Sequence, residues 1–376
     1  MRPVVSVGLR PGALDAAERL GRPVIAVVDT PPGRTTAARL AAVVEAPFEE
    51  VLDHVDAIAA LGPAAVVGLA ERAVVPAAHL REALGHPGCA VDTAVRCSDK
   101  RAMKRAVRAA GLRCADVVEA EEGLAGADLV DRLGLPMVLK AAVGSGGRGT
   151  RVVRDAADVP DGLPGGWMAE AFVEGVEMSV ETLVVDGRTV FVNPTAYLEP
   201  AWASLAPAPL SAADLDAVRV HAEAARVALG VTTGMTHLEL FLTPDGPVFG
   251  ELAIRPPGGH LMRLIEQAYA FDPWEAVLRV ALGEPVDVPT QAGRVAAVQI
   301  LHPGEGTVLA ADGLEEARSL PGVEAVSLRV RPGDAVGPRV GTGQEIGHVI
   351  VTGATAEEAQ ARLAEATAAI RVEVAA

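Results

Sequence analysis

The stretch of sequence that decides the fold comprises residues 236–255 and reads THLELFLTPDGPVFGELAIR. Two apolar runs flank the Asp245-Gly246 pair, and an Asp-Gly turn between such runs is the strongest short-range signal for a β-hairpin. Side chains alternate between the two faces of a strand, so each strand should present its acidic residue on a defined face. The expected faces carry His237, Glu239 and Phe241 on the first strand, and Phe249, Glu251 and Ala253 on the second.

Antiparallel pairing of this hairpin brings Glu239 and Glu251 side by side. Adjacent carboxylates repel each other at a cost of about 1 kcal/mol or more unless a cation lies between them. Mg²⁺ is commonly held by one or two carboxylates together with phosphate oxygens. Arg255, four residues after Glu251, supplies the fork-shaped donor that suits a phosphate or an acyl-phosphate oxyanion. Isolated glutamates on strands are usually surface residues, but the hairpin and the arginine together predict a site for Mg²⁺, with Mn²⁺ as an alternative ion.

A second signal is the glycine-rich stretch at 139–149, LKAAVGSGGRG, in which four glycines within six residues leave backbone N–H groups free to approach a phosphate. Gly144, Gly146 and Gly149 formally satisfy G-x-G-x-x-G. A dinucleotide-binding fold requires a helix next, whereas residues 150–154, TRVVR, predict a strand. The Gly-Lys-Ser/Thr ending of a Walker A loop and the His-Arg-Asp and Asp-Phe-Gly elements of kinases are absent. A strand-loop-strand flap over the phosphates of a nucleotide remains, with a plain glycine-rich hairpin loop as the alternative.

The charge balance argues against nucleic acid as a partner. The 33 basic and 49 acidic residues give a net charge of -16, which opposes binding to a polyanion. No apolar run reaches the roughly 18 residues of a membrane span, and the N-terminus reads as a strand and not as a signal peptide. We therefore expect a cytoplasmic protein with neither a nucleic acid nor a membrane partner.

Lysine is scarce in this chain. Of the 33 basic residues only Lys100, Lys104 and Lys140 are lysines, and arginine serves everywhere else. The remaining lysines should therefore lie where a compact ammonium is required and a wide guanidinium does not fit. Lys100 follows Ser98 and Asp99, either of which is a candidate N-cap for a helix that ends near Gly111, and Lys140 directly precedes the glycine-rich stretch.

The pattern of apolar runs predicts an α/β protein with three parts. From residue 4 to about 90 apolar runs alternate with alanine-rich helical stretches, one of them at 36–43, which predicts βαβ units and a parallel sheet. Short helices and strands then predict an α+β lid, followed by long strands, and Pro-Gly pairs mark a β-rich end closed by a helix at 356–370. The expected domains are 1–97, Rossmann-like; 98–285, including the lid at about 113–175; and 286–376, β-rich.

Taken in chain order, these motifs resemble the ATP-grasp superfamily. They are Asp99-Lys100, Lys140 before the glycines, EAFVEGVE at 170–177, Glu239, Glu251, and RPPGG at 255–259. Each motif alone is moderately specific, but six in this order cover nearly the whole chain. The resemblance implies an ATP-grasp fold behind a Rossmann-like N-terminal domain, with ATP and Mg²⁺ as cofactors.

The resemblance also implies a role for individual residues. Lys100 and Lys140 would hold the ATP phosphates, under a flap that includes Ser145, Gly146, Gly147 and Gly149. The strand with Glu170, Phe172 and Val173 would hold the adenine through its backbone, with Glu177 on the ribose. Glu239 and Glu251 would bind Mg²⁺. The implied catalytic residues are Arg255, which would steady the γ-phosphate and the acyl phosphate, Lys140, and His260 on the substrate side.

The sequence ELAIRPPGGH at 251–260, together with a β-rich C-terminal end, is most similar to the L-amino acid ligase branch. That branch implies an ATP-dependent ligase that converts a carboxylate into an acyl phosphate and joins it to an amine, with small carboxylates and amines as substrates and a homodimer as the assembly. Many members of the superfamily carry a metal-binding Asn two residues after the second glutamate, where this chain has Ala253.

Two other functions fit the same motifs. An ATP-grasp enzyme of the purine-pathway or biotin-carboxylase type would activate bicarbonate or formate. A non-catalytic nucleotide-binding protein would keep the fold alone, but the glutamates, lysines and arginine that are present here argue against it.

Overall fold

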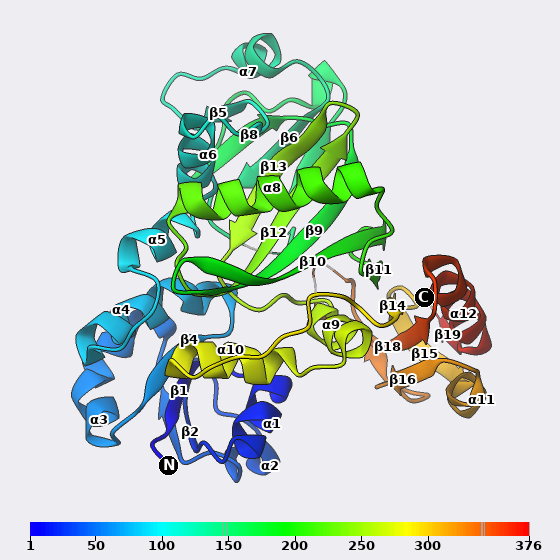
Figure 1. The fold of residues 1–376 in the computed structure, drawn as a ribbon. Coiled ribbons are helices and arrows are strands. Elements are labelled where there is room, and N and C mark those ends of the chain that lie inside the picture. Colours follow the sequence, from blue (N-terminus) through cyan, green and yellow to red (C-terminus); the bar gives the residue numbers. More distant parts are fainter. Residues whose placement is uncertain (145, 148, 340, 342, 376) are drawn as a thin grey trace.

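The structure is a computed structural model that describes residues 1–144, 146–147, 149–339, 341 and 343–375. The described strands form four sheets, and the largest, of eight strands, runs through the middle of the molecule (Figure 1). In that view the N-terminal sheet lies below this central sheet and a smaller lid lies above it.

The N-terminal sheet is parallel, with strand order β3-β2-β1-β4. β1 and β2 are buried along their whole length, as a parallel sheet covered by helices requires. The predicted parallel sheet of βαβ units is confirmed. Its elements are β1 (Val4–Val7), α1 (Pro11–Arg19), β2 (Val24–Val28), α2 (Arg34–Ala37), β3 (Ala42–Glu45), η1 (Phe48–His54), α3 (Val55–Ala60), β4 (Ala65–Gly68), η2 (Glu71–Ala73), α4 (Val74–Leu84) and α5 (Val91–Arg96).

The helix predicted at 36–43 is wrong for most of its length. α2 is a single turn that ends at Ala37, and β3 begins at Ala42. β3 pairs in parallel with β2, and its β-branched Val43 and Val44 suit an edge strand. Pairing with a neighbouring strand decides the conformation here, and the local pattern of apolar residues does not display that pairing.

The lid is an antiparallel sheet with strand order β5-β8-β6-β7 and a small core of its own, centred on Leu129 and Met137. The chain enters it through α6, where the Asp99 carboxylate accepts hydrogen bonds from the backbone N–H groups of Arg101 and Ala102, as expected of an N-cap. Its elements are α6 (Lys100–Ala109), β5 (Val117–Glu119), α7 (Gly126–Leu133), β6 (Met137–Ala141), β7 (Arg151–Val153), η3 (Ala156–Asp158) and β8 (Trp167–Ala171).

The central sheet has the strand order β13-β12-β9-β10-β11-β14-β18-β16. The predicted Asp245-Gly246 hairpin is confirmed as β12–β13. The Asp186-Gly187 pair, which joins β9 to β10, gives the same Asp-Gly signal, and both of its residues have the positive φ of a tight hairpin turn. α8 crosses one face of the sheet (Figure 1). The elements of this part are β9 (Val176–Val185), β10 (Arg188–Glu199), β11 (Ala203–Ala206), α8 (Ala212–Leu229), β12 (Gly234–Thr243), β13 (Gly246–Ala253), α9 (Leu261–Tyr269) and α10 (Pro273–Leu282).

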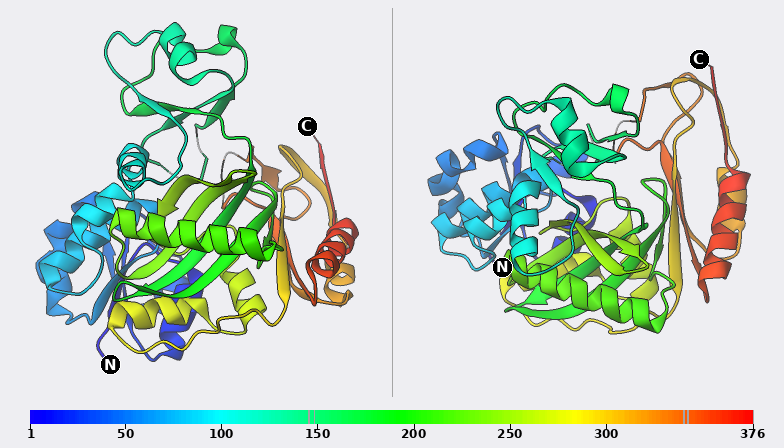
Figure 2. Two further views of the ribbon diagram at one scale, coloured as in Figure 1. Left: turned by 45° about the horizontal axis from the view of Figure 1, so that its top comes forward. Right: turned by 90° about the horizontal axis from the view of Figure 1, so that it is seen from above.

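The C-terminal strands continue the central sheet, because β14 pairs with β11 and is followed by β18 and β16. α12 packs on β14 and β18 (Figure 2). The predicted domain boundaries remain predictions. The elements are β14 (Val295–Leu301), β15 (Gly306–Asp312), α11 (Leu314–Ser319), β16 (Val323–Leu328), β17 (Ala335–Val336), β18 (Gly347–Gly353), α12 (Ala356–Ala369) and β19 (Arg371–Ala375).

Two strands lie beside a loop or an end of the chain. The loop at Trp202 joins β10 to the short strand β11. The helix at the C-terminal end was expected to close the chain, but β19 follows it and pairs with β15. β19 pairs with β15, and β11 pairs with its neighbour β10 and also with β14, so each strand has one partner that is remote in sequence.

Candidate active site

A cavity of about 460 Å³ lies between the lid and the central sheet. All three lysines of the chain line it. The predicted site residues found on its wall are Lys100, Lys140, Gly147, Glu170, Phe172, Val173, Glu177, Glu239 and Glu251. Arg255, His260, Gly146 and Gly149 lie outside that wall, and Ser145 lies outside the described residues.

At the lid side of the cavity two ammonium groups share one carboxylate. The Nζ atoms of Lys140 and Lys104 lie 2.9 Å and 3.1 Å from the same oxygen of Glu170, Oε2. Burial alone would raise the pKa of Glu170, but the two lysines lower it overall, so its carboxylate is charged. Its other oxygen, Oε1, is buried and has no hydrogen-bond partner among the residues that the structure describes. The pair of lysines leaves an excess of positive charge beside the cavity, which suits a polyphosphate.

Lys104 is a site residue that the sequence-based assignment missed. It lies one helical turn after Lys100 on α6, and positions i and i+4 share a face of a helix. That spacing and the scarcity of lysine were the signals that could have identified it.

Lys100 connects three parts of the site. Its Nζ donates a hydrogen bond of 2.7 Å to the carbonyl oxygen of Gly144, at the start of the glycine-rich loop, and lies 3.1 Å from Oε2 of Glu251. Lys100 is the first residue of α6. Its side chain therefore holds together the start of this helix, the glycine-rich loop and the second predicted metal ligand, Glu251.

The two predicted metal ligands pair directly, because Glu239 stands opposite Glu251 in the β12–β13 register. A bulge follows Glu239, where Gly250 is the extra residue and Phe249 stands opposite Leu240. The expectation that Phe249 shares a face with Glu251 is therefore wrong, and Phe249 packs with Leu240 in the core. The bulge breaks the alternation on which that expectation depended.

The electrostatics of this pair fit a divalent cation. Burial and the neighbouring Glu239 raise the pKa of Glu251. Burial alone would also raise the pKa of Glu239, but the contact with His237 lowers it overall. Burial, Glu239 and Glu251 together raise the pKa of Glu177 to about 7. Glu239 and Glu251, paired and buried, are carboxylate donors of the kind that Mg²⁺ binds together with phosphate oxygens.

Arg255 follows β13 of the central sheet and contacts η2, which belongs to the N-terminal part of the chain with the parallel sheet. Its Nε donates to Oε2 of Glu71 at 2.7 Å, and its Nη1 donates to the carbonyl oxygen of Pro256 at 3.0 Å. It also lowers the pKa of Glu239, so its charge reaches the metal-ligand pair. The predicted role of Arg255 at the phosphates remains a prediction.

His260 contacts the chain at and just before β18, near its C-terminal end. It has a left-handed backbone, with φ of 63°, and directly precedes α9. Its Nε2 lies 3.5 Å from Oε1 of Glu345, and its ring lies 4.0 Å from the ring of His348. Hydrogen bonds to Glu345, that from His260 foremost, lower its pKa to about 2. This group stands apart from the lysines and carboxylates, and its predicted contact with substrate remains a prediction.

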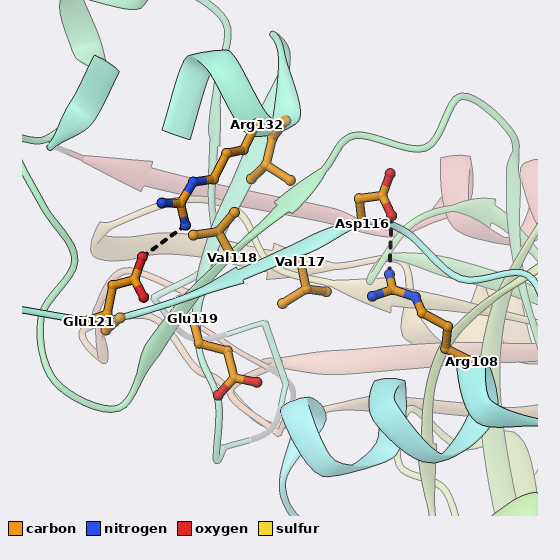
Figure 3. Close-up of a pocket in the computed structure, with 9 residues that line it drawn as sticks. Arg108, Asp116, Val117, Val118, Glu119, Glu121 and Arg132 are labelled. Carbon is orange, nitrogen blue, oxygen red and sulfur yellow. Dashed lines mark hydrogen bonds and ion pairs between the residues drawn. The ribbon is translucent and has the colours of Figure 1, made fainter. Parts of the chain in front are cut away.

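A second opening, of about 580 Å³, lies along β5 on the lid (Figure 3). Its wall carries the surface ion pairs Arg132–Glu121 and Arg108–Asp116, at 2.8 Å and 3.2 Å. None of the predicted site residues that the structure describes lines it. Exposed ion pairs of this kind contribute little binding energy, so we place the chemistry in the cavity between lid and central sheet.

Comparison with known proteins agrees with this geometry. The sequence profile of the ATP-grasp domain matches residues 105–264, and the profile of L-amino acid ligase C-terminal domain 2 matches residues 299–375. A formate-dependent phosphoribosylglycinamide formyltransferase of Burkholderia vietnamiensis is 30% identical, over 95% of this chain and 91% of its own length. The chain belongs to the ATP-grasp family. Membership confirms the predicted fold, the carboxylate-amine ligase class of enzyme, and ATP and Mg²⁺ as cofactors.

Other relatives of this ATP-grasp enzyme differ in named activity. An L-arginine-specific L-amino acid ligase of Bacillus subtilis is 28% identical over 72% of this chain and 70% of its own length. An uncharacterized protein of Sinorhizobium fredii is 31% identical over 70% of this chain, which spans only 58% of that relative. The crystal structure of an L-amino acid ligase from Bacillus licheniformis covers the chain completely with a TM-score of 0.85 at 23% identity, which is a likeness of fold. Among the described residues, no helix is both long and apolar enough to cross a membrane.

Proposed function

We propose that this ATP-grasp enzyme phosphorylates the carboxylate of an amino acid or a related small acid and couples it to an amine, forming an amide or peptide bond. The observation that carries the proposal is the place in the sequence of the residues around His260. Glu345 and His348, which surround it, belong to the segment that matches the C-terminal domain of L-amino acid ligases. The substrate end of the site would thus be built from the part of the chain that is specific to that branch.

The first step would take place in the cavity. A carboxylate oxygen of the acid attacks the γ-phosphorus, and the bond from that phosphorus to the leaving ADP oxygen breaks. Lys140 and Lys100 would hold the phosphates, and Arg255 would stabilise the charge that develops on the transferred group. Mg²⁺, held by Glu239 and Glu251, would neutralise phosphate charge. Ala253 supplies no further metal ligand, so Glu239 and Glu251 would be the ligands that the protein contributes.

The second step needs water to be excluded. The amine nitrogen attacks the acyl carbon, the carbon–oxygen bond to phosphate breaks, and the amine's proton leaves with the products. An acyl phosphate that met water would hydrolyse instead, so the glycine-rich loop between β6 and β7 would close over the site. The hydrogen bond from Lys100 to Gly144 already ties the start of this loop to the site.

A second candidate function is activation of formate. The observation in its favour is the 30% identity to a formate-dependent phosphoribosylglycinamide formyltransferase, which extends over nearly the whole of both chains. In that case the acid would be formate and the amine would be a ribonucleotide. A homodimer remains a prediction under either function.

The test is a screen of ADP release with Mg²⁺ and ATP. We expect rapid release only when an amino acid and a second amine are both present, with a new amide detected by mass spectrometry. Release that requires formate and phosphoribosylglycinamide, with no response to any pair of amino acids, would overturn the proposal in favour of the second candidate. Release at an equal rate without any carboxylate would contradict both.

A further inference from the structure

Beside Glu239 lies a buried polar cluster that the proposed mechanism does not use. At its centre is Glu181, which is 0% exposed and receives hydrogen bonds on both carboxylate oxygens. Its partners are Ser179 at 2.8 Å and His237 at 2.9 Å on Oε1, and Asn193 at 2.9 Å and Thr195 at 2.6 Å on Oε2. A carboxylate buried to this extent is costly unless every oxygen is satisfied, so its position is well determined.

His237 connects this cluster to the predicted metal ligand. Its Nδ1 is bound to Glu181, and its Nε2 lies 3.6 Å from Oε1 of Glu239, within ion-pair distance. In the β12–β13 register His237 stands opposite Ala253, whose side chain is a single methyl group. Residues that stand opposite in paired strands share a face, so a small residue at 253 leaves room for the imidazole.

Within the described part of the chain, the polar contacts of the Glu239 side chain fall on one of its oxygens. Tyr197 donates its hydroxyl to Oε1 at 3.5 Å, and His237 approaches the same atom. With Oε1 held on this side, Oε2 is left for a cation on the cavity side. The geometry would present the carboxylate in a single orientation.

We propose that His237 is a positioning residue, oriented by Glu181, that holds the Glu239 carboxylate in the orientation that binds the metal ion. The inference rests on the proposed function only in taking Glu239 as a metal ligand. Groups that orient a ligand in this manner contribute strongly to metal binding, and their loss typically weakens it by about 10- to 100-fold. A purely structural role is the alternative, since a buried polar network also stabilises a sheet.

Two variants of His237 separate these roles. The amide nitrogen of Asn occupies the position of Nδ1, and that of Gln the position of Nε2, because each lies the same number of bonds from Cβ. His237→Asn therefore keeps the donor toward Glu181 and loses the one toward Glu239, and His237→Gln does the reverse. Thr195→Val is the matched control, because it removes a donor to Glu181 that does not contact Glu239.

The measurement is Mn²⁺ binding to the whole protein with a non-hydrolysable ATP analogue, followed by electron paramagnetic resonance, with thermal melting of each variant alongside. We expect about 10- to 100-fold weaker Mn²⁺ binding for His237→Asn, clear recovery for His237→Gln, and wild-type binding for Thr195→Val even if it melts earlier. Equal Mn²⁺ affinity in His237→Asn and the wild type would overturn the proposal. A clear loss of Mn²⁺ affinity of the same size in both His237→Gln and Thr195→Val would also overturn it, and this comparison decides if His237→Asn does not fold.

This assay includes no acid or amine substrate. A wild-type protein that binds Mn²⁺ with nucleotide, but forms no amide from any pair of amino acids, would end the proposed function and leave the role of His237 standing. Undiminished Mn²⁺ binding in Glu239→Gln would instead remove the premise that Glu239 is a metal ligand.

Discussion

Two ammonium groups on one carboxylate oxygen are possible because lysine is narrow. Lys104 and Lys140 both approach Oε2 of Glu170, and Lys100 contacts Glu251 at the other side of the cavity. A planar guanidinium has a wider donor array and would not fit beside a second cation at the same oxygen. A chain that otherwise uses arginine keeps two of its three lysines where this constraint applies, and the third lines the same cavity.

At this scale we predict that Lys140→Ala reduces ATP-dependent product formation by about 10²-fold or more while the protein remains folded. The ammonium stabilises phosphate charge and contributes little to packing. Turnover and thermal melting should be measured together, with Arg132→Ala on the outer face of the lid as the control. Normal turnover in Lys140→Ala would refute the assignment of the nucleotide site.

The raised pKa of Glu177 predicts a pH dependence of stability in the protein without ligands. The folded pKa of about 7 lies above the ordinary value of 4.5, so between these values the folded state binds a proton that the unfolded state has released. The free energy of unfolding therefore falls as the pH rises from 4.5 to about 7. Glu177→Gln should melt close to the wild type near pH 4.5 and at a higher temperature at pH 8. Melting curves that stay parallel across this range would contradict the assignment.

At the scale of elements, the β12–β13 hairpin sets the spacing of the metal ligands through its bulge. Gly250 is the residue that makes the bulge possible, because a Cβ atom there would lie 2.7 Å from the carbonyl oxygen of Glu239. If Gly250 paired regularly with Glu239, Glu251 would stand opposite Leu238, on the other face of the hairpin.

We therefore expect Gly250→Ala to destabilise the protein by about 1–3 kcal/mol, as overpacking does, and to weaken binding of Mn²⁺ with nucleotide. Chemical denaturation and metal titration would measure the two effects. Gly165→Ala is the control, since a Cβ atom there meets nothing within 4 Å. Unchanged metal binding in Gly250→Ala would show that the bulge does not set the ligand geometry.

At the scale of the whole molecule, one sheet joins the nucleotide site to the C-terminal unit. β11 pairs with β10 on one side and β14 on the other, and Leu205 on β11 packs into the core under α12. A continuous sheet of this kind should make the middle and the end of the chain unfold together.

Leu205→Ala tests this coupling. The side chain is 0% exposed, so its truncation should cost about 2–5 kcal/mol, and the loss should appear in one cooperative transition. Urea unfolding should be followed by both tryptophan fluorescence and circular dichroism. Leu309→Ala, on an exposed position of β15, should have little effect. Two separate transitions would show that the C-terminal unit unfolds independently.

The sequence by itself determined the features that depend on neighbouring residues. The Asp-Gly turns place both hairpins, Asp99 caps α6, and the order of motifs predicts the ATP-grasp family. These are short-range effects of backbone conformation and capping, so a local stretch of residues contains the information.

Only the tertiary structure decided which distant groups meet. Lys104 and Glu170, Arg255 and Glu71, and His260 and Glu345 are each brought together by packing of separate units. The joining of β11 to β14 and the Glu181–His237–Glu239 connection likewise follow from strand order and register. Such contacts form between segments far apart in the chain, whose closure depends on the whole core and leaves no pattern in the sequence around either partner.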